Sequence, residues 1–370
     1  MKILVVFGTR PEAVKMCPLV IELKKHKEFD CKVCLTGQHR EILSQMMQAF
    51  GVEADYDLDI MKEKQTLNLI TSSVLEKLDP VLEKENPNIV LIHGDTTTSF
   101  SAALAAFYRK IPVGHVEAGL RTGNIYSPYP EEMNRLLSDR ICTYYFAPTE
   151  LNRQNLIKEG IEKNIFVTGN TVIDSFEYTV SPDYIFSNNA IRNLDFHAHR
   201  VIPITAHRRE NIGLPLVNIC NAIKKLALKY KNDIFVYPVH PNPAVKDTVY
   251  DILSGLENVV LTDPLDVFDM HNLLSRCFLV MTDSGGLQEE APHFGKPVIV
   301  LRTETERSEA VSAGTVMVVG VSEEKIVLEA SKLLDNNDKY EKMAGATNPY
   351  GDGRASQRIA EILLNTISIS

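Results

Sequence analysis

Short apolar runs rich in β-branched residues alternate along the chain with segments of helical spacing. In the first half these runs occupy 3–7, 31–36, 88–93, 111–117, 143–148 and 164–169. Continuous apolar runs are typical of parallel strands that are buried on both faces. The segments between them have the spacing of amphipathic helices and cover 11–26, 40–50, 66–84, 97–109, 130–140 and 149–158. This alternation predicts a doubly wound parallel sheet.

A second series of the same kind fills the other half of the chain. Its apolar runs occupy 200–205, 233–239, 258–263, 278–283, 297–301 and 315–320. The polar stretch 179–199 lacks strand character and lies close to the predicted boundary. We therefore predict an α/β protein with two Rossmann-like doubly wound domains, 1–175 and 176–354. Parallel sheets of this type bind ligands beyond the carboxyl ends of their strands, so the two domains are expected to face a central cleft.

Length and composition agree with a folded, two-domain chain. The 370 residues exceed what one hydrophobic core usually supports, and 44% of them are hydrophobic. The net charge of −9 and the lack of a basic arm argue against nucleic-acid binding. No apolar run approaches the roughly 20 residues of a membrane span. The six cysteines are mostly in apolar stretches, as expected for reduced thiols in the cytoplasm.

Polar residues follow the predicted strands of the first domain. Gly8 and Arg10 open a helix in which Lys15 lies about one turn further on, an arrangement suited to an anion. Asp95 follows the third run, and Glu117 ends the fourth on the strand face that His115 shares.

Glu131 follows in the first turn of a predicted helix. Simpler interpretations remain open, because Asp95 also fits an N-cap and Glu131 also complements a helix dipole. Crowded carboxylates raise the pKa of at least one member, which yields both an acid and a base near neutral pH. Such groups also suit a divalent metal, but the usual metal-binding motifs are missing, and we predict neither a metal nor a cofactor.

The second domain carries a different set of post-strand residues. His207 lies beside two arginines, as in phosphate binding or proton transfer, although a structural histidine is the alternative. Ser284, Gly285 and Gly286 follow a strand and open a helix, and they expose backbone N–H groups to an anion. Walker A, G-x-G-x-x-G and G-x-S-x-G motifs are absent, which weakens the NTPase, dinucleotide and hydrolase interpretations.

Taken in order, these motifs resemble the non-hydrolysing UDP-N-acetylglucosamine (UDP-GlcNAc) 2-epimerases. The resemblance covers nearly the whole chain and rests on GTRPEAVKM, TGQHRE, HGDTTT, GHVEAGLRTG, YPEEMNR, GNTVIDS, TAHRREN, YPVHPNP, TDSGGLQEEAP, ERSEAV and NPYGDGRAS. It implies a glycosyltransferase-B-like fold in which the last helix, within 355–370, crosses back to the first domain.

The resemblance also implies a reaction at C2 of UDP-GlcNAc that yields UDP-N-acetylmannosamine (UDP-ManNAc). UDP is expelled, 2-acetamidoglucal forms, and the proton returns to the other face. The implied catalytic positions are Asp95, Glu117, Glu131 and His207. The implied substrate-binding positions include Asp95, Glu117 and His207 and add Arg10, Lys15, Leu265, Met270, Ser284, Gly285, Gly286, Glu290 and Arg307.

Further expectations concern regulation and partners. Gln38 and His240 match a site where bacterial relatives bind a second UDP-GlcNAc as an activator, and relatives are often homodimers. The product would supply ManNAc units for cell-surface polysaccharides. A hydrolysing epimerase that releases ManNAc and UDP, a glycosyltransferase on the same scaffold and a nucleotide-sugar sensor remain as alternatives.

Overall fold

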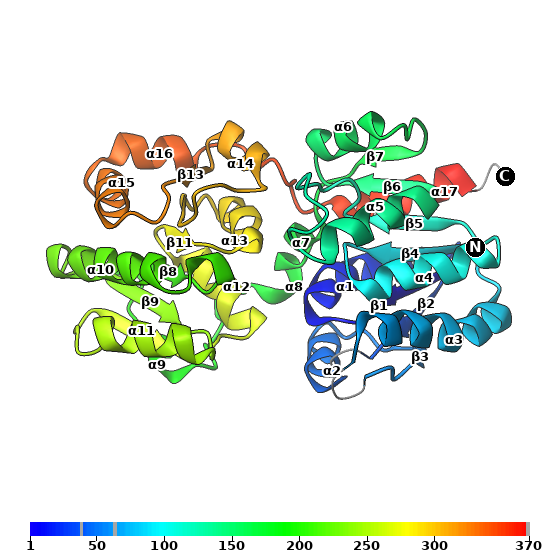
Figure 1. The fold of residues 1–370 in the computed structure, drawn as a ribbon, viewed down its shortest axis with the longest axis horizontal. Coiled ribbons are helices and arrows are strands. Elements are labelled where there is room, and N and C mark those ends of the chain that lie inside the picture. The colour runs from blue at the N-terminus through cyan, green and yellow to red at the C-terminus, as the bar shows by residue number, and fades with distance from the viewer. Residues whose placement is uncertain (38–39, 62–64, 368–370) are drawn as a thin grey trace. The chain divides into compact units, whose positions relative to one another are not determined.

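The computed structural model describes residues 1–37, 40–61 and 65–367 and divides into two compact units (Figure 1). Unit 1 comprises Met1–Tyr178 and Tyr350–Ser370, and unit 2 comprises Thr179–Pro349. The sequence-based boundaries lie a few residues away, at 175/176 and 354/355. Among the described residues, no helix has the length and apolar character needed to cross a membrane.

Unit 1 is built on a wholly parallel sheet with the order β3-β2-β1-β4-β5-β6-β7. Its strands are β1 (Lys2–Phe7), β2 (Asp30–Leu35), β3 (Tyr56–Asp57), β4 (Ile89–His93), β5 (Val113–Val116), β6 (Tyr144–Ala147) and β7 (Ile165–Val167). Its helices are α1 (Arg10–Lys25), α2 (Arg40–Ala49), α3 (Leu67–Glu85), α4 (Thr97–Tyr108), α5 (Glu131–Ile141), α6 (Glu150–Lys158), α7 (Thr171–Asp174), α8 (Phe176–Thr179) and α17 (Ala355–Ile367).

Unit 2 repeats the same strand order in a parallel sheet, β10-β9-β8-β11-β12-β13. Its strands are β8 (Val201–Thr205), β9 (Ile234–Pro238), β10 (Val259–Thr262), β11 (Val280–Thr282), β12 (Val298–Val300) and β13 (Val316–Val318). Its helices are α9 (Asn189–Arg192), η1 (Arg209–Asn211), α10 (Leu214–Lys229), α11 (Pro243–Leu253), α12 (Val267–Arg276), α13 (Gly285–Glu290), η2 (Ala291–Phe294), α14 (Ser308–Ala313), α15 (Glu323–Asp335) and α16 (Asn337–Ala344). Both units therefore have the Rossmann arrangement, and the α/β prediction of two doubly wound domains is confirmed.

The apolar runs become strands because helices cover both faces of each sheet. In unit 1, α3, α4 and α5 pack together on one face, while α1, α2, α7 and α17 pack together on the other. Residues Ile3–Phe7 of β1 are at most 1% exposed. Each such aliphatic side chain contributes about 1.5–3 kcal/mol through burial, which explains why these strands need unbroken apolar sequence.

Local signals set where the helices begin. Thr9 caps α1 in a capping box with Glu12, and Pro11 lies in the first turn, as the sequence indicates. The cap of α4 is Thr96, whose side chain accepts from the N–H of Ser99, so the N-cap interpretation of Asp95 is wrong. Asp95 lies just before the cap, and its side chain is available for other contacts.

The last helix belongs to unit 1. α17 packs against α1 and α7, and Figure 1 shows it in red among the helices of that unit. The carboxylate of Asp174 in α7 accepts hydrogen bonds from the N–H groups of Ala355 (3.2 Å) and Ser356 (2.6 Å). A buried carboxylate thus caps the first turn of α17 and fixes the returning segment.

Candidate active site

The loops after β1 and β4 flank the point where the strand order of unit 1 reverses, and Glu12 joins them. One carboxylate oxygen accepts from the N–H groups of Gly8 (2.9 Å) and Thr9 (2.8 Å). The other accepts from the hydroxyls of Thr96 (2.7 Å) and Ser99 (2.8 Å). Glu12 therefore fixes the start of α1 against the turn that carries Asp95. Glu12 is not among the site residues predicted from the sequence.

Glu117 follows β5 and is a buried carboxylate in a strained backbone conformation. Its φ of +67° lies in the left-handed region, which non-glycine residues adopt at a cost of about 1–3 kcal/mol and mostly at functional sites. Because β5 ends at Val116, Glu117 does not share a strand face with His115, and that expectation is wrong. The backbone twist directs the carboxylate toward Lys15, which forms an ion pair with it.

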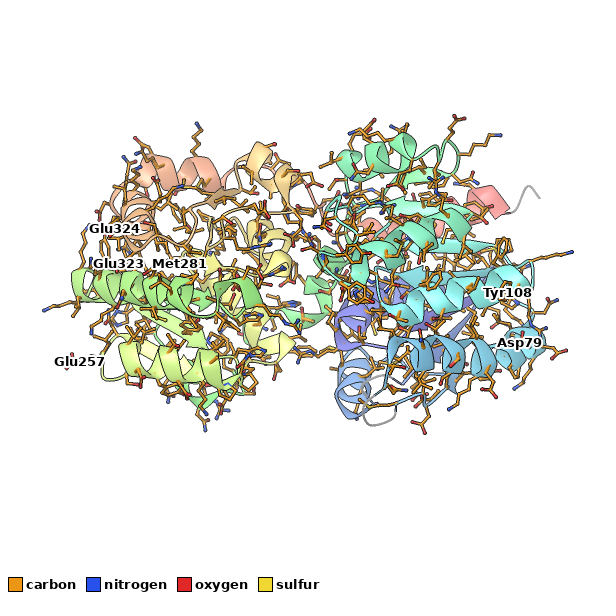
Figure 2. The ribbon with its side chains drawn as sticks, viewed as in Figure 1. Asp79, Tyr108, Glu257, Met281, Glu323 and Glu324 are labelled. Carbon is orange, nitrogen blue, oxygen red and sulfur yellow. The ribbon has the colours of Figure 1, made fainter. Side chains whose placement is uncertain are left out.

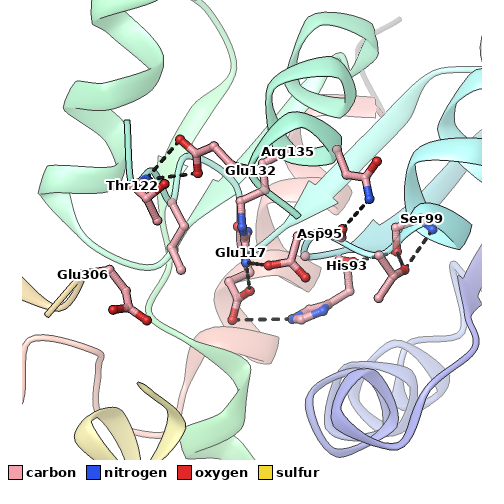
Figure 3. A network of polar contacts seen from close by, with 12 residues as sticks. His93, Asp95, Ser99, Glu117, Thr122, Glu132, Arg135 and Glu306 are labelled. Atoms are coloured by element: carbon pink, nitrogen blue, oxygen red, sulfur yellow. Dashed lines mark hydrogen bonds and ion pairs between the residues drawn. The ribbon is translucent and has the colours of Figure 1, made fainter. Parts of the chain in front are cut away.

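Arg135 holds two of the predicted acids together (Figure 3). Its Nη2 lies 2.6 Å from Asp95 Oδ2 and 2.8 Å from Glu117 Oε2. Its Nη1 donates to the carbonyl of Glu117 at 2.9 Å. We call Lys15, Asp95, Glu117 and Arg135 the charged cluster. Arg135 was missed as a site residue, although it lies within the YPEEMNR motif.

The charged cluster controls the ionisation of Glu117. Burial alone raises the pKa of Glu117, but the cations of Lys15 and Arg135 lower it well below the ordinary value. Glu117 is therefore ionised. An ionised, nearly dry carboxylate beside two cations can accept a proton once the cations move or are neutralised.

His115 contacts the turn that carries Asp95 of the charged cluster. Its ring nitrogens lie 2.6 Å from Asp139 Oδ1 and 2.8 Å from the carbonyl of Gly94. Arg121 pairs with Asp139 on the other side at 2.6 Å. This buried network fixes the turn before Asp95, so His115 has a structural role here.

The two acids at the start of α5 differ in their environment. Glu132 accepts from the N–H groups of Thr122 (3.0 Å) and Gly123 (2.9 Å), so it anchors the preceding loop. Oε2 of Glu131 is buried and makes no hydrogen bond within the described part of the chain. A buried carboxylate oxygen without a partner calls for an explanation, and a ligand group is one.

In unit 2, Asp283 organises the loop after β8 in the way that Glu12 does in unit 1. Its Oδ2 accepts from the N–H groups of His207 (2.7 Å) and Arg208 (2.9 Å) and from Nδ2 of Asn211 (3.0 Å). Asp283 is completely buried. It links the His207 loop after β8 to the Ser284 loop after β11, and these loops flank the reversal of strand order in this sheet.

The imidazole of His207 stacks on that of His240, with ring centroids 5.1 Å apart and an interplanar angle of 5°. Its Nδ1 lies 3.7 Å from Asp283 Oδ1. Burial and the neighbouring His240 lower the pKa of His207, while Asp283 opposes that shift. A largely neutral His207 fits a proton acceptor better than a fixed cation.

The start of α13 has the features expected of an anion site. Ser284 occupies the cap position but makes no capping hydrogen bond with its side chain. A Cβ on Gly285 would lie 3.3 Å from Oε1 of Glu306 and 3.4 Å from Nη2 of Arg307. A Cβ on Gly286 would lie 3.1 Å from Oε1 of Glu290. The glycines thus keep the helix start open to charged side chains.

Arginines and glutamates alternate around this helix start. Arg307 pairs with Glu289, and its Nη1 lies 3.7 Å from Glu306. Glu306 also contacts Arg302 (2.6 Å) and Arg208 (3.3 Å). Burial raises the pKa of Glu306, but these arginines lower it to about 2. Sequence reasoning identified Arg307 but not Glu289 or Glu306.

The remaining predicted residues are placed as follows. Arg10 is exposed at the start of α1. Leu265 and Met270 pack in a small apolar cluster with Phe186 and Leu273, so their side chains face the core. Gln38 lies outside the described residues. Among the described residues, no group of His, Cys, Asp and Glu side chains is arranged to hold a metal ion.

The chain is similar to known proteins over nearly its whole length. The family model described as UDP-N-acetylglucosamine 2-epimerase matches residues 21–364. The UDP-N-acetylglucosamine 2-epimerase of Bacillus subtilis (strain 168) is 50% identical over 365 residues, covering 98% of this chain and 95% of that protein.

Two solved structures are similar over nearly their full length. The UDP-GlcNAc 2-epimerase of Neisseria meningitidis bound to UDP-GlcNAc has a TM-score of 0.90 at 49% identity, covering 99% of this chain and 100% of that one. The Methanocaldococcus jannaschii enzyme in complex with UDP-GlcNAc and UDP has a TM-score of 0.80 at 33% identity, covering 98% and 99%. This chain is therefore a member of the UDP-N-acetylglucosamine 2-epimerase family.

Proposed function

We propose that this chain interconverts UDP-GlcNAc and UDP-ManNAc without net hydrolysis. The observation that carries the proposal is the charged cluster, in which the acids Asp95 and Glu117 share Arg135 at the strand ends of a chain of this family. A binding protein for an anionic sugar nucleotide has no need of buried carboxylates, since they repel the ligand.

Inversion at C2 needs help because the C2–H bond is not adjacent to a carbonyl group. In the proposed reaction a base takes the C2 proton while the C1–O bond breaks and its electron pair leaves with UDP. The product of this step is 2-acetamidoglucal. UDP then adds back at C1 while a proton arrives at C2 on the opposite face, so atoms and charge balance and no water is consumed.

We assign the proton transfers to Asp95, Glu117, Glu131 and His207. Glu117 is ionised, which suits a base, and the unpartnered oxygen of Glu131 suits contact with the sugar. The geometry leaves open which of them takes the C2 proton. Measurements of turnover in variants of these residues are needed to assign their individual roles.

We assign the diphosphate to the start of α13 and its arginines. Ser284, Gly285 and Gly286 are assigned to it at the start of this helix, and Arg307 adds a cation beside them. The N–H of Ser284 already donates to Oγ1 of Thr282 at 2.9 Å, so the expectation that this N–H faces an anion is wrong and the Ser284 hydroxyl is the group assigned. Arg10 and Lys15 at the start of α1 would complete the charge. Such preorganised donors stabilise the negative charge that develops on departing UDP. Glu290 is assigned to the ribose.

Leu265 and Met270 are assigned to the uracil through their main-chain groups, because their side chains pack in the core cluster.

The deciding experiment is an NMR time course of UDP-GlcNAc in D₂O. We expect deuterium at C2 and a lasting mixture of UDP-GlcNAc and UDP-ManNAc. Stoichiometric free ManNAc and UDP would instead identify a hydrolysing enzyme, and UDP release without C2 exchange a glycosyltransferase. Binding of an unchanged sugar nucleotide would identify a sensor.

Variants test the assignment of the acids. We expect Asp95→Asn, Glu117→Gln and His207→Asn each to lower turnover by at least about 100-fold, the scale of general acid–base catalysis. Glu324→Gln is a matched control, because Glu324 is exposed on α15 in unit 2 (Figure 2). Near-normal turnover in all three site variants would remove the catalytic assignment.

We also infer an activator site and a dimer. His240 stacks on His207, so a second UDP-GlcNAc at His240 and Gln38 would act directly on a catalytic residue. Sigmoidal dependence of rate on UDP-GlcNAc tests this, and His240→Ala should remove it. Phe107 and Tyr108 are 56% and 68% exposed at the end of α4, a surface suited to a second copy. Figure 2 labels Tyr108. Light scattering after size exclusion measures the oligomeric state.

The proposed place of action is the cytoplasm. All six cysteines are buried free thiols, which fits a reducing compartment.

A further inference from the structure

His93 is a buried histidine that the proposed mechanism leaves unused. It ends β4 and is 4% exposed. Its carbonyl accepts from the hydroxyl of Ser99 at 2.7 Å, which fixes its backbone. Neither ring nitrogen makes a hydrogen bond within the described part of the chain. Buried polar side chains nearly always have a hydrogen-bond partner, so an imidazole without one needs an explanation.

The imidazole of His93 lies close to the carboxylate of Glu117. Nε2 of His93 lies 3.8 Å from Oε1 of Glu117 (Figure 3). The same Oε1 is paired with Lys15 and accepts from Nδ2 of Asn170 at 3.3 Å. A normal N–H···O bond is about 2.9 Å long, so a shift of roughly 1 Å would bring His93 onto this oxygen. Lys15 already occupies that place through its ion pair with Glu117.

Burial keeps the imidazole of His93 neutral although charged groups surround it. Glu117 and Asp95 face it as anions, while Lys15 and Arg135 face it as cations. Burial outweighs their combined effect and lowers the pKa of His93 to about 3. A neutral imidazole has one N–H donor and one acceptor nitrogen. Only the tautomer with hydrogen on Nε2 can donate to a carboxylate at this position.

We propose that His93 is a positioning residue that takes the place of Lys15 on Glu117 when a nucleoside diphosphate draws Lys15 away. This inference rests on the proposed function, which assigns Lys15 to the diphosphate. The Nε2–H of His93 then donates to Oε1 and keeps the carboxylate ionised and correctly oriented. Because His93 is neutral, it orients Glu117 without the full charge of a lysine, so the carboxylate stays basic enough to accept a proton.

The test compares His93→Phe, His93→Gln and His93→Asn. Phenylalanine keeps the ring but has no donor. Glutamine can place an amide N–H near the Nε2 position, while asparagine can reach only the Nδ1 position. Ser101→Ala is the control, since Ser101 is also buried, on α4, and its hydroxyl donates to the carbonyl of Thr97 at 2.6 Å.

We expect His93→Phe to lower kcat about 10- to 100-fold, the effect of one hydrogen bond to a charged group. The acid limb of the kcat–pH profile should move to higher pH by about one unit or more, while KM stays within about twofold. His93→Gln should recover most of kcat and His93→Asn should not. Equal kcat profiles for all three variants, or a change in KM alone, would overturn the inference.

A second measurement does not depend on activity. UDP binding is followed calorimetrically in buffers of different ionisation enthalpy, which counts the protons taken up. Glu117 without Lys15 or His93 should take up a proton, so His93→Phe should bind UDP with more proton uptake than the unmodified chain. Equal uptake overturns the role of His93. Absence of epimerisation by the unmodified chain overturns the proposed function instead.

Discussion

Gly119 and Gly160 form a matched pair that tests how tightly the Glu117 loop is held. Both have a left-handed backbone, with φ of +82° and +83°. A Cβ on Gly160 would meet nothing within 4 Å in the described part of the chain. A Cβ on Gly119 would lie 2.3 Å from the carbonyl oxygen of Asn152 and 3.0 Å from Cγ of Leu156. Replacing each by alanine therefore adds the same backbone strain but very different contacts.

The structure sets the expected difference. An alanine in the left-handed backbone conformation costs about 1–2 kcal/mol of stability, and this strain should account for the whole destabilisation by Gly160→Ala. In Gly119→Ala the C···O distance must grow to about 3.3 Å, so the backbone of Asn152 or the loop must move by roughly 1 Å. Asn152 forms the capping box of α6 with Thr149, so that movement also weakens a helix start. We expect an additional loss of about 2–4 kcal/mol for Gly119→Ala.

Thermal unfolding of the two variants under identical conditions measures this difference. About 1 kcal/mol shifts the Tm of a domain of this size by about 2–4 °C, so the two midpoints should differ by roughly 4 °C or more. The epimerisation rate should fall only in Gly119→Ala, because the displaced loop carries Glu117. Equal midpoints and rates would refute the reasoning that this close approach fixes the site.

The remaining predictions concern charged residues. Arg135→Met should lower thermal stability and abolish turnover, because breaking a buried ion pair costs about 3–5 kcal/mol, and Arg135→Lys should recover only part of the stability. Glu306→Gln should tighten UDP binding about two- to fivefold in calorimetry, since Glu306 competes with the ligand for arginines and such pairs are worth up to about 1 kcal/mol; weaker binding would contradict this. Because the pKa of Glu306 is lowered from its ordinary value of 4.5 to about 2, ionised Glu306 stabilises the folded protein at pH values above 4.5. This stabilisation is lost as the pH falls from 4.5 toward about 2. Tm measured over that range should therefore fall less steeply in Glu306→Gln.

The sheet could be predicted from sequence because strands buried on both faces must be apolar throughout. Every predicted run contains a strand of the structure. β3 was missed because its two residues, Tyr56–Asp57, lie at the sheet edge and are not buried. The short helices α7, α8 and α9 were missed because a helix of a single turn shows no periodicity.

The site could be predicted only in part. Asp95, Glu117 and Ser284 were found because the carboxyl ends of parallel strands meet at one edge. The residues that form ion pairs with them lie on helices elsewhere in the chain, as Arg135 does. The local spacing of residues does not indicate which of these side chains will form the ion pair. The conformation of Glu117 could not be predicted either, since a positive φ at a glutamate breaks the side-chain alternation from which we expected His115 and Glu117 to share a strand face.

The ion pairs of Lys15 and Arg307 bear on how the proposed reaction is controlled. Lys15 is paired with Glu117, and Arg307 with Glu289, so an arriving diphosphate exchanges partners with carboxylates that are already in place. When Lys15 turns to the phosphate, the main cation that lowers the pKa of Glu117 is withdrawn, and the carboxylate becomes a stronger base. Under the proposed function, binding of the leaving group would thus increase the basicity of Glu117. Water or a sugar without the nucleotide would leave Lys15 on Glu117, and the carboxylate would stay a weaker base until UDP is present.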